Sequence, residues 1–515
     1  MTKGKVKGNQ NLDEVKKIAC DLIDENQILK EQVKSLQNMV FGRKSEKTPK
    51  DDGQMSLFDM PEPELPLLEE KEEDISIGEH TRKKRGRKPL PAHLPRIEVI
   101  HELSEDERKC NCGCLKERIG QEESEQLDYI PAKVRVLRNI RYKYACKNCE
   151  GVEDDGPTVS IARMPDQIIP KSIATPGLLA HILTAKFADA LPFYRQEKQF
   201  SRIGIELGRS TMCTWTMKVA GACDILIDLM QKDILASPMI GVDETPLQVL
   251  KGPRKSKAYM WVFRGGPPDK PIIQFQYHPT RSGDVAASFL NGYKGIVQTD
   301  GYKGYDFLDK IMDIIHAACW THARRGFKKV TKVAGNKKSS SGNADTALKY
   351  ISLLYKIEKE ARVQELTPEQ LYARRQKEAV PILEEFKKWL DARVEKVPPK
   401  SLLGKAIHYT LNQWHRLVQY TTNGIIRPDN NLVENAIRPF VVGRKNWLFS
   451  DTVQGARASA LIYSLIETAK SNELEPYWYM KYLFEHLPEA MTEDDFRALL
   501  PYNVDKKQLA GPTAP

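Results

Sequence analysis

The chain has 515 residues, with 79 Lys and Arg against 69 Asp and Glu, and therefore a formal net charge of +10. Hydrophobic residues make up 41% of it, which is enough for at least one large core and excludes wholesale disorder. No apolar run approaches the roughly 18 residues that a membrane span needs, and the polar first residues do not resemble a secretory signal. The sequence therefore predicts a cytoplasmic protein with no membrane partner, and the positive charge suggests a polyanionic one.

Residues 1–45 carry a heptad repeat. Its a positions hold Leu12, Ala19, Asn26, Val33 and Val40, and its d positions hold Val15, Leu22, Leu29 and Leu36. A single Asn at an a position favours a two-stranded parallel coiled coil. We expect a leucine-zipper-like segment that forms a homodimer or supports a higher assembly; an amphipathic helix packed on its own chain is the alternative.

The charge of the chain changes sign between residues 46–80 and residues 81–108. The first segment contains four prolines and an acidic cluster, and is predicted to be a flexible linker. The second segment begins with six cations within seven residues: Arg82, Lys83, Lys84, Arg85, Arg87 and Lys88. An extended basic strand can lie in a narrow minor groove, so we expect this arm to contact double-stranded DNA without sequence specificity. A solvated basic linker is the alternative.

Five of the nine cysteines lie between residues 110 and 149, which indicates metal binding in a reducing compartment. Two short clusters joined by a β-rich stretch at 133–142 predict a zinc ribbon over 109–155, held by a structural Zn²⁺. The expected ligands are Cys110, Cys112, Cys146 and Cys149, with Cys114 as the alternative to Cys112. A chance cluster of free thiols is the competing interpretation.

Residues 160–235 are predicted to form a helical region that binds DNA or bridges neighbouring domains. A helix-turn-helix is one interpretation of Ser201–Lys218, with its turn at 207–210 and Ser210 as the cap of the second helix. An ordinary pair of helices inside the fold is the alternative.

From residue 239 the pattern changes to short β-rich runs. Strands are expected over 239–250 (broken near Pro246), 258–263, 271–277, 295–301 and 314–320, with a helix over 284–290 and a short helix before the last strand. Three hairpin-capable strands followed by βαβ units predict a mixed sheet with helices on its faces. This is also the order of an RNase-H-like core, which we expect over 236–330 and 421–470. The overall fold class is therefore multidomain α/β.

Two aspartates interrupt these apolar strands. Asp243 follows Met-Ile-Gly-Val and Asp300 follows Ile-Val-Gln-Thr, and a carboxylate in such a place is costly unless it is paired or binds a metal. Glu434 is the third candidate, because it lies near the start of a short helix, where the helix dipole favours its charged form. Taken singly, the three acids have structural alternatives: a turn residue, a strand-end cap and a surface ion pair.

The helix of Glu434 has local start and stop signals. Asp429 or Asn430 is the expected cap, and Pro439 is expected to end or kink the helix. Together the three acids predict a site for two Mg²⁺ or Mn²⁺ ions roughly 3.5–4 Å apart, which would support cleavage of a DNA phosphodiester and strand transfer.

Cations flank the three acids. The expected phosphate contacts are Arg324, Arg325, Arg438, Arg444 and Lys445. Residues 331–420 are predicted to be a helical insertion whose cations, Arg374, Arg375, Lys377, Lys387 and Lys388, either support DNA or form a solvated helix face. Residues 471–515 are expected to form a C-terminal helical tail. For His316 and His322 we expect packing or structural hydrogen bonds.

Short motifs occur along the chain, beside the Cys-rich segment: Phe41–Glu46, Arg87–Pro91, Gly241–Thr245, Thr299–Tyr302, Cys319–Arg325, Asp429–Glu434 and Gly443–Phe449. In these motifs the chain resembles the transposases of the insertion sequence 66 family over nearly its whole length. The resemblance implies a DDE transposase whose triad is Asp243, Asp300 and Glu434. It further implies binding to the element's terminal inverted repeats and to target DNA, element-encoded accessory proteins, and a nucleoid-associated location in a prokaryotic cell.

Two other functions are compatible with parts of the sequence. An RNase-H-like nuclease would cut DNA without strand transfer. A catalytically dead, dimeric DNA-binding regulator would explain residues 1–160 but would leave the three acids without a purpose.

Overall fold

The computed structural model describes residues 134–145, 159–161, 164–253, 257–334 and 342–509, together with six helical residues between Leu22 and Val33. The basic arm, the five clustered cysteines and nearly all of the predicted linker and zipper lie outside these residues. The chain divides into two compact units, Pro61–Met164 and the remainder. Within the helices that the structure describes, none is long and apolar enough to cross a membrane.

The described part of the unit Pro61–Met164 is a short antiparallel pair of strands, β1 (Lys143–Ala145) and β2 (Val159–Ile161). The β-rich stretch expected at 133–142 is wrong in position, because residues 134–142 form no strand and β1 begins at Lys143. The described strand β2 pairs with Lys143–Ala145 alone, so residues 134–142 have no strand partner within the described part of the chain.

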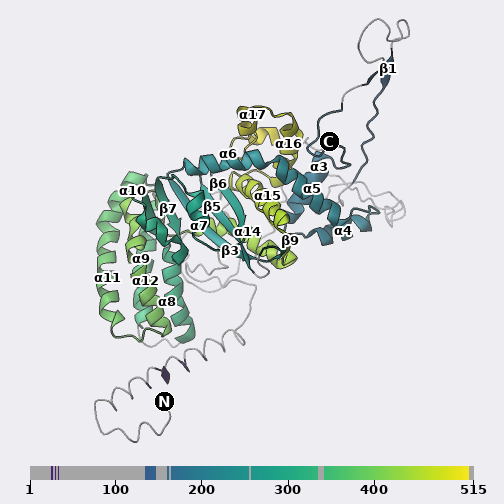
Figure 1. Ribbon diagram of the computed structural model, residues 1–515. Helices are drawn as coiled ribbons and strands as arrows, with labels where there is room; N and C mark the ends of the chain where they lie inside the picture. Colours follow the sequence, from purple (N-terminus) through teal and green to yellow (C-terminus); the bar gives the residue numbers. More distant parts are fainter. Residues whose placement is uncertain are drawn as a thin grey trace, which may run out of the picture. The chain divides into compact units, whose positions relative to one another are not determined.

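A five-stranded mixed sheet forms the centre of the other unit (Figure 1). Its strand order is β6-β5-β3-β7-β8. The strands are β3 (Met239–Leu247), β5 (Ala258–Gly265), β6 (Ile272–His278), β7 (Gly295–Thr299) and β8 (Ile314–Ala318). The first three are antiparallel to one another, whereas β7 and β8 extend the sheet from β3 in parallel. The predicted mixed sheet is therefore confirmed.

The segments between these strands follow the predicted order. Helix α7 (Asp284–Phe289) joins β6 to β7, and the 3₁₀ segment η1 (Lys303–Lys310) joins β7 to β8. The break expected near Pro246 falls two residues later, at Gln248: β3 continues through the proline and ends at Leu247, and β4 (Val249–Lys251) then pairs with β9 (Ser450–Thr452). Strand β7 pairs with Met239–Gly241 alone, so at Pro246 β5 is the neighbouring strand on one side and no described strand lies on the other. The missing N–H of the proline is tolerated there, as it is on an edge strand.

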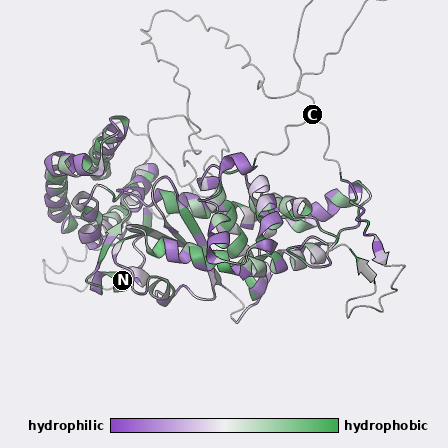
Figure 2. Ribbon diagram, turned by 90° about the horizontal axis from the view of Figure 1, so that it is seen from above, coloured by the Kyte–Doolittle hydropathy of each residue, from purple (hydrophilic) through white to green (hydrophobic). Residues whose placement is uncertain are grey.

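Helices cover the sheet and protect its edge. Helix α15 (Val453–Ser471) packs against the edge strand β6 and satisfies backbone groups that the sheet leaves unpaired. Ser464 accepts a hydrogen bond from the backbone N–H of Phe275 at 2.8 Å, and Thr468 accepts one from Ile273 at 3.0 Å. Figure 2 shows the hydrophobic residues concentrated on the strands and on the helix faces turned toward them.

The remaining helices of this core cover the sheet or lie beside it (Figure 1). They are α3 (Pro176–Phe187), α4 (Phe193–Arg202), α5 (Arg209–Ala222), α6 (Asp224–Leu235), α14 (Asn431–Trp447), α16 (Pro476–His486), η4 (Leu487–Glu489), α17 (Glu493–Ala498) and η5 (Lys506–Leu509). The helix-turn-helix interpretation required Ser210 to cap a second helix, and Ser210 does not do so. Helix α5 already begins at Arg209, with Gly208 as its cap, and buries Met212, Trp215 and Val219 in the core.

The region between β8 and α14 forms a separate bundle beside β8 (Figure 1). Its elements are α8 (Trp320–Ala334), α9 (Asn343–Val363), α10 (Pro368–Arg374), the π-helical turn η2 (Arg375–Ala379), α11 (Val380–Val394), α12 (Leu402–Asn412), α13 (Trp414–Leu417) and η3 (Val418–Thr422). It has its own core, in which Trp320 and Phe386 pack together with Phe327.

Candidate active site

Strand register brings Asp243 and Asp300 to the same place in the sheet. The parallel strands β3 and β7 pair Gly241 with Gln298, and each aspartate stands two residues further along its strand direction. Since adjacent strands lie about 4.8 Å apart and side chains alternate with a period of two, the two carboxylates are neighbours on one face. Burial, together with the charges of nearby carboxylates that include Asp300 and Glu434, raises the pKa of Asp243 well above its usual range.

A close approach between a helix and a strand adds Glu434 to this pair. A Cβ on Gly241 would lie 2.4 Å from Cγ2 of Val433, so only glycine lets α14 pack this tightly on β3. The amide of Asn430 donates to the carbonyl of Val242 at 3.1 Å and fixes the start of α14 on the strand. Glu434 follows in the first turn of the helix.

The helix that carries Glu434 differs from the predicted one. Asn430, one of the two expected caps, is the N-cap residue of α14, and Oδ1 of the preceding Asp429 accepts a hydrogen bond from the backbone N–H of Asn431 at 3.2 Å. The prediction that Pro439 ends the helix is wrong, because α14 continues to Trp447. Its apolar face, which includes the fully buried Phe440, packs on the core and outweighs the backbone hydrogen bond that proline removes.

Glu434 lies in a nearly closed environment. Its side chain is 11% exposed, and burial raises its pKa. Helix α8 contributes two neighbours: Nη2 of Arg325 lies 3.4 Å from Oε2, and Nδ1 of His322 lies 3.6 Å from Oε1. Oε1 has no hydrogen-bond partner within the described parts of the chain. Burial and the charge of Arg325 lower the pKa of His322 to about 4, so its imidazole is neutral near pH 7.

The three acids have the properties of a cation site. Neighbouring carboxylates repel one another when all are charged, and a bound divalent cation removes this repulsion. The set consists of hard oxygen donors, which suit Mg²⁺ or Mn²⁺. The buried, unpartnered Oε1 of Glu434 provides a free ligand atom.

A second acidic residue lies beside Asp243, and sequence reasoning missed it. Glu244 is wholly buried and accepts hydrogen bonds from Nε of Arg281, at 2.6 Å, and from the hydroxyl of Tyr305. The guanidinium of Arg281 lies 3.8 Å from the ring centre of Tyr302. This network fixes the backbone next to Asp243. A second charged residue within an apolar strand was the signal that could have revealed it.

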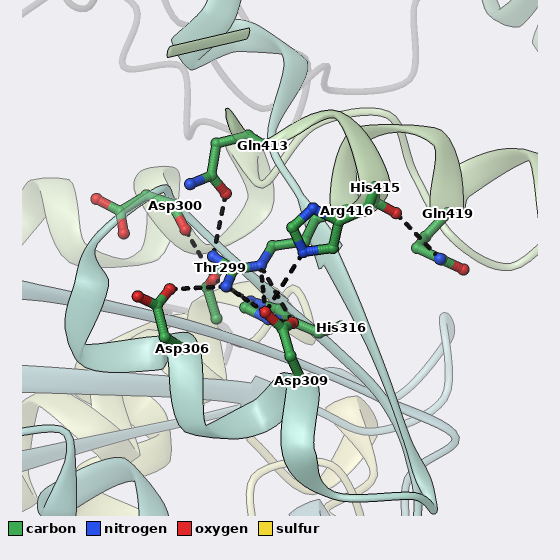
Figure 3. A network of polar contacts seen from close by, with 9 residues as sticks. All are labelled: Thr299, Asp300, Asp306, Asp309, His316, Gln413, His415, Arg416 and Gln419. Carbon is green, nitrogen blue, oxygen red and sulfur yellow. Dashed lines mark hydrogen bonds and ion pairs between the residues drawn. The ribbon is translucent and has the colours of Figure 1, made fainter. Parts of the chain in front are cut away.

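A polar network connects the insertion with the end of β7 (Figure 3). Arg416 of α13 contacts both carboxylate oxygens of Asp309, with Nε at 3.1 and 3.0 Å, and its Nη2 lies 2.7 Å from Asp306. Burial opposes ionisation of Asp309, but hydrogen bonds from Arg416 and His316 lower its pKa to about 2. Asp309 is therefore a carboxylate throughout the neutral range.

His316 carries this network to the residue that precedes Asp300. Its Nδ1 lies 2.8 Å from Asp309, and its Nε2 lies 2.8 Å from the hydroxyl of Thr299. Thr299 also donates to the backbone carbonyl of Asp300 at 2.8 Å. His316 is 5% exposed, so its structural, hydrogen-bonded role agrees with the sequence prediction.

The predicted phosphate-contacting cations lie on two helices that border the acids. Helix α8 carries Arg324 and Arg325, and α14 carries Arg438, Arg444 and Lys445. Arg444 donates to the hydroxyl of Thr245 on β3 at 3.1 Å, and Lys445 is exposed.

The sequence suggested that Arg375, one of the cations of the insertion, supports DNA or lies on a solvated helix face. The structure contradicts both roles. The Arg375 side chain is 1% exposed and forms two hydrogen bonds with Glu358, at 2.8 and 2.7 Å. The Arg375 guanidinium also donates hydrogen bonds to the backbone carbonyls of Tyr420 and Asn423. Arg375 is therefore a structural residue of the bundle, whereas Lys377 is exposed.

Comparison with protein families gives matches along the chain. The family described as "Transposase IS66 family" matches residues 171–458, which is more than half of the chain. Three further matches are "Transposase C of IS166 homeodomain" at 28–99, "zinc-finger binding domain of transposase IS66" at 107–150 and "IS66 C-terminal element" at 464–502. The zinc-finger match covers all five clustered cysteines.

Two relatives from Sinorhizobium fredii (strain NBRC 101917 / NGR234) match most of the chain. The uncharacterized protein y4jD is 34% identical over 441 residues, which cover 82% of each chain. The uncharacterized protein y4qI is 32% identical over 434 residues, or 81% of this chain and 77% of the relative. With its zinc-finger region and a family match across the whole sheet, the chain belongs to the IS66 family of transposases.

Proposed function

We propose that this transposase cleaves DNA at the ends of an insertion sequence and joins them to target DNA, with Asp243, Asp300 and Glu434 as its catalytic triad. The observation that carries the proposal is the convergence of these acids from two adjacent parallel strands and one helix. Asp243 and Glu434 both have raised pKa values, caused first by burial. The strand order, three antiparallel strands extended by two parallel ones, supports an RNase-H-like core.

Mg²⁺ or Mn²⁺ is the cofactor that fits these residues. Asp243, Asp300 and Glu434 would hold two such ions through carboxylate oxygens. Bound there, the ions would promote ionisation of the attacking water or 3′-hydroxyl and offset the charge that develops on the leaving oxygen.

The residues around the triad would position it and hold the DNA. Gly241 lets α14 approach β3 and so sets the distance of Glu434 from the aspartates. Arg325 limits the movement of Glu434 from one side. Arg324, Arg438, Arg444 and Lys445 lie on helices that border the acids, where cations can neutralise phosphates of the bound strand.

The regions outside the described residues have proposed roles that follow from the sequence. The arm with Arg82, Lys83, Lys84, Arg85, Arg87 and Lys88 would bind the DNA backbone. Residues 1–45 would form a homodimer or a higher assembly, and element-encoded accessory proteins are further partners. Within the zinc-finger region, Cys110, Cys146 and Cys149 would hold Zn²⁺ together with Cys112 or Cys114. Elemental analysis should then show this zinc lost in the double variant Cys146→Ser/Cys149→Ser.

The experiment is a reaction of the full chain with DNA that carries the terminal inverted repeats of the element, a target plasmid and Mg²⁺ or Mn²⁺. Accessory proteins are supplied. Joined products that disappear in Asp300→Asn and Glu434→Gln would support the proposal. Cleavage without joining would instead identify a nuclease, and binding without cleavage would identify a DNA-binding regulator; either result overturns strand transfer.

A further inference from the structure

A thiol, an imidazole and a carboxylate converge where α8 begins. One ligand atom from each of Cys319, His322 and Glu434 lies within 4.8 Å of the others. Cys319 occupies the junction between β8 and α8, and His322 follows in the first turn of α8. Glu434 reaches the same place from the first turn of α14. Three residues, from the end of β8 and the first turns of α8 and α14, therefore bring possible metal-ligand atoms close together.

The separation between His322 and Glu434 suits two ligands of one metal ion. Nδ1 of His322 and Oε1 of Glu434 are 3.6 Å apart, which is too far for a hydrogen bond. With metal–ligand distances of about 2.0–2.2 Å, two donors at a tetrahedral angle lie roughly 3.3–3.6 Å apart. Both atoms are buried, and neither has a hydrogen-bond partner among the residues that the structure describes. Buried polar atoms without partners are rare, and an ion would satisfy both of them.

The third donor is a thiol whose pKa burial raises to about 12, so a bound metal ion would have to displace its proton, and backbone hydrogen bonds act in that direction. Cys319 is fully buried, and the backbone N–H of Asn430 donates to its Sγ at 3.2 Å. A hydrogen bond to the sulfur stabilises negative charge on it and fixes its orientation. In metal sites, groups that hydrogen-bond to the metal-ligating side chains have the same effect. Cys223, the other fully buried cysteine of the described chain, belongs to no such cluster.

We propose that Cys319, His322 and Glu434 form a binding site for a Zn²⁺-class transition-metal ion, which shares only Glu434 with the Mg²⁺ or Mn²⁺ site of the three acids. Zn²⁺ takes sulfur, nitrogen and oxygen ligands in a tetrahedron, whereas Mg²⁺ takes oxygen ligands in an octahedron. Three protein ligands leave a fourth position of a tetrahedron open. Zn²⁺ also binds mixed sites of this kind more tightly than Mn²⁺ does.

Because Glu434 belongs to both sets, zinc in this site would withdraw a ligand from the catalytic ions. This consequence rests on the proposed function, and it makes zinc an inhibitor of the Mg²⁺-dependent reaction. The binding site itself does not depend on catalysis. Metal content and inhibition are therefore measured separately.

The first test measures zinc bound to the full chain after equilibration with a low, buffered concentration of free Zn²⁺. The expected content is one zinc for the zinc-finger region and one for this site, and Cys319→Ser and His322→Asn should each lose only the second. Cys223→Ser, which changes an equally buried thiol, should keep both. Thermal melting identifies any variant that fails to fold, and His322→Asn alters a partly exposed side chain as the milder change. A wild-type chain with one zinc, or a second zinc retained in both site variants, overturns the proposal.

The second test adds Zn²⁺ to the Mg²⁺-dependent cleavage reaction. The concentration for half-inhibition should rise by about tenfold or more in Cys319→Ser, because the loss of a ligand weakens metal affinity. An unchanged concentration would contradict inhibition through this site. If no variant or wild-type chain cleaves DNA, the proposed function fails while the zinc content still decides whether the site exists.

Discussion

Arg416 and Asp309 form a two-oxygen ion pair between the insertion and the segment that follows β7. The Arg416 side chain is 4% exposed, and the partner segment leads through His316 and Thr299 to Asp300. The insertion is thus bonded to the strand end that carries a proposed catalytic residue. This relationship explains how a bundle inserted between two parts of the core can influence chemistry.

We expect Arg416→Met to destabilise the protein by about 2 kcal/mol, because it removes a nearly buried guanidinium that pairs with both Asp306 and Asp309. The rate of DNA cleavage should fall about tenfold as Asp300 loses its fixed position. Denaturant titration and initial cleavage rates measure the two effects. Lys387→Ala is the control, since Lys387 pairs with Asp391 on an exposed surface of the same bundle and should contribute less than about 0.5 kcal/mol. Equal effects of the two substitutions would contradict this account.

His316 should make stability depend on pH. Burial, followed by the charge of Arg416, lowers its pKa to about 4, below the ordinary value of 6.5. The unfolded chain therefore binds a proton between these pH values and the folded chain does not. His316 contributes stability that is present above pH 6.5 and is lost as the pH falls through about 4, by up to about 3 kcal/mol.

The variant His316→Gln keeps hydrogen-bonding capacity but cannot titrate. Its free energy of unfolding should change less than that of the wild type between pH 7 and pH 4, because all other groups titrate in both proteins. Denaturant titrations at several pH values give this difference. Parallel curves for the two proteins would show that His316 is not the cause.

Glu244 and Arg281 should show strong coupling in a double-mutant cycle. Arg281→Met leaves Glu244 buried and charged, which costs about 3 kcal/mol, whereas adding Glu244→Gln should recover more than half of that loss. The pair Lys251 and Asp451 is the control, because both side chains are more than half exposed and should couple by less than about 0.5 kcal/mol. Additive effects at Glu244 and Arg281 would be inconsistent with an ion pair that stabilises the buried Glu244 carboxylate.

Arg375 provides a test of the bundle. Arg375→Lys keeps the charge but loses the fork that contacts Glu358 and two backbone carbonyls, so we expect a loss of about 3 kcal/mol in the free energy of unfolding. Lys377→Met, two residues away and exposed, should change it by less than about 0.5 kcal/mol. If Arg375→Lys leaves the free energy of unfolding nearly unchanged, the forked contacts of the guanidinium are not needed for stability.

The sequence could predict features that depend on neighbouring residues. Short β-rich runs predicted the strands and their order along the chain, and charged residues inside those runs singled out Asp243 and Asp300. The partners of Arg375 and Arg416 could not be predicted in this way. Arg416 meets Asp309, which precedes it by 107 residues, and Arg375 meets carbonyls 45 and 48 residues later. Such contacts arise only when the bundle has packed.

Local rules also failed where tertiary contacts outweighed them. Pro246 lies inside β3 because one side of that strand is unpaired there, and Pro439 lies inside α14 because the helix is packed against the core. Glu244 was overlooked beside Asp243, since the charge pattern marks both acids but does not show that Glu244 pairs with Arg281, 37 residues later. Sequence patterns therefore located the acids but not the residues that position them.

The most direct test of the central claim compares initial rates of DNA cleavage at an element end, in Mg²⁺, for the wild type, Asp243→Asn and Asp451→Asn. Asp243 has a raised pKa, so removal of its charge should leave the metal-free fold at least as stable, which thermal melting verifies. We predict that Asp243→Asn lowers the cleavage rate by about 10³-fold or more, equivalent to roughly 4 kcal/mol. The exposed Asp451→Asn should leave it unchanged. A folded Asp243→Asn protein that still cleaves within about tenfold of the wild-type rate would contradict the account.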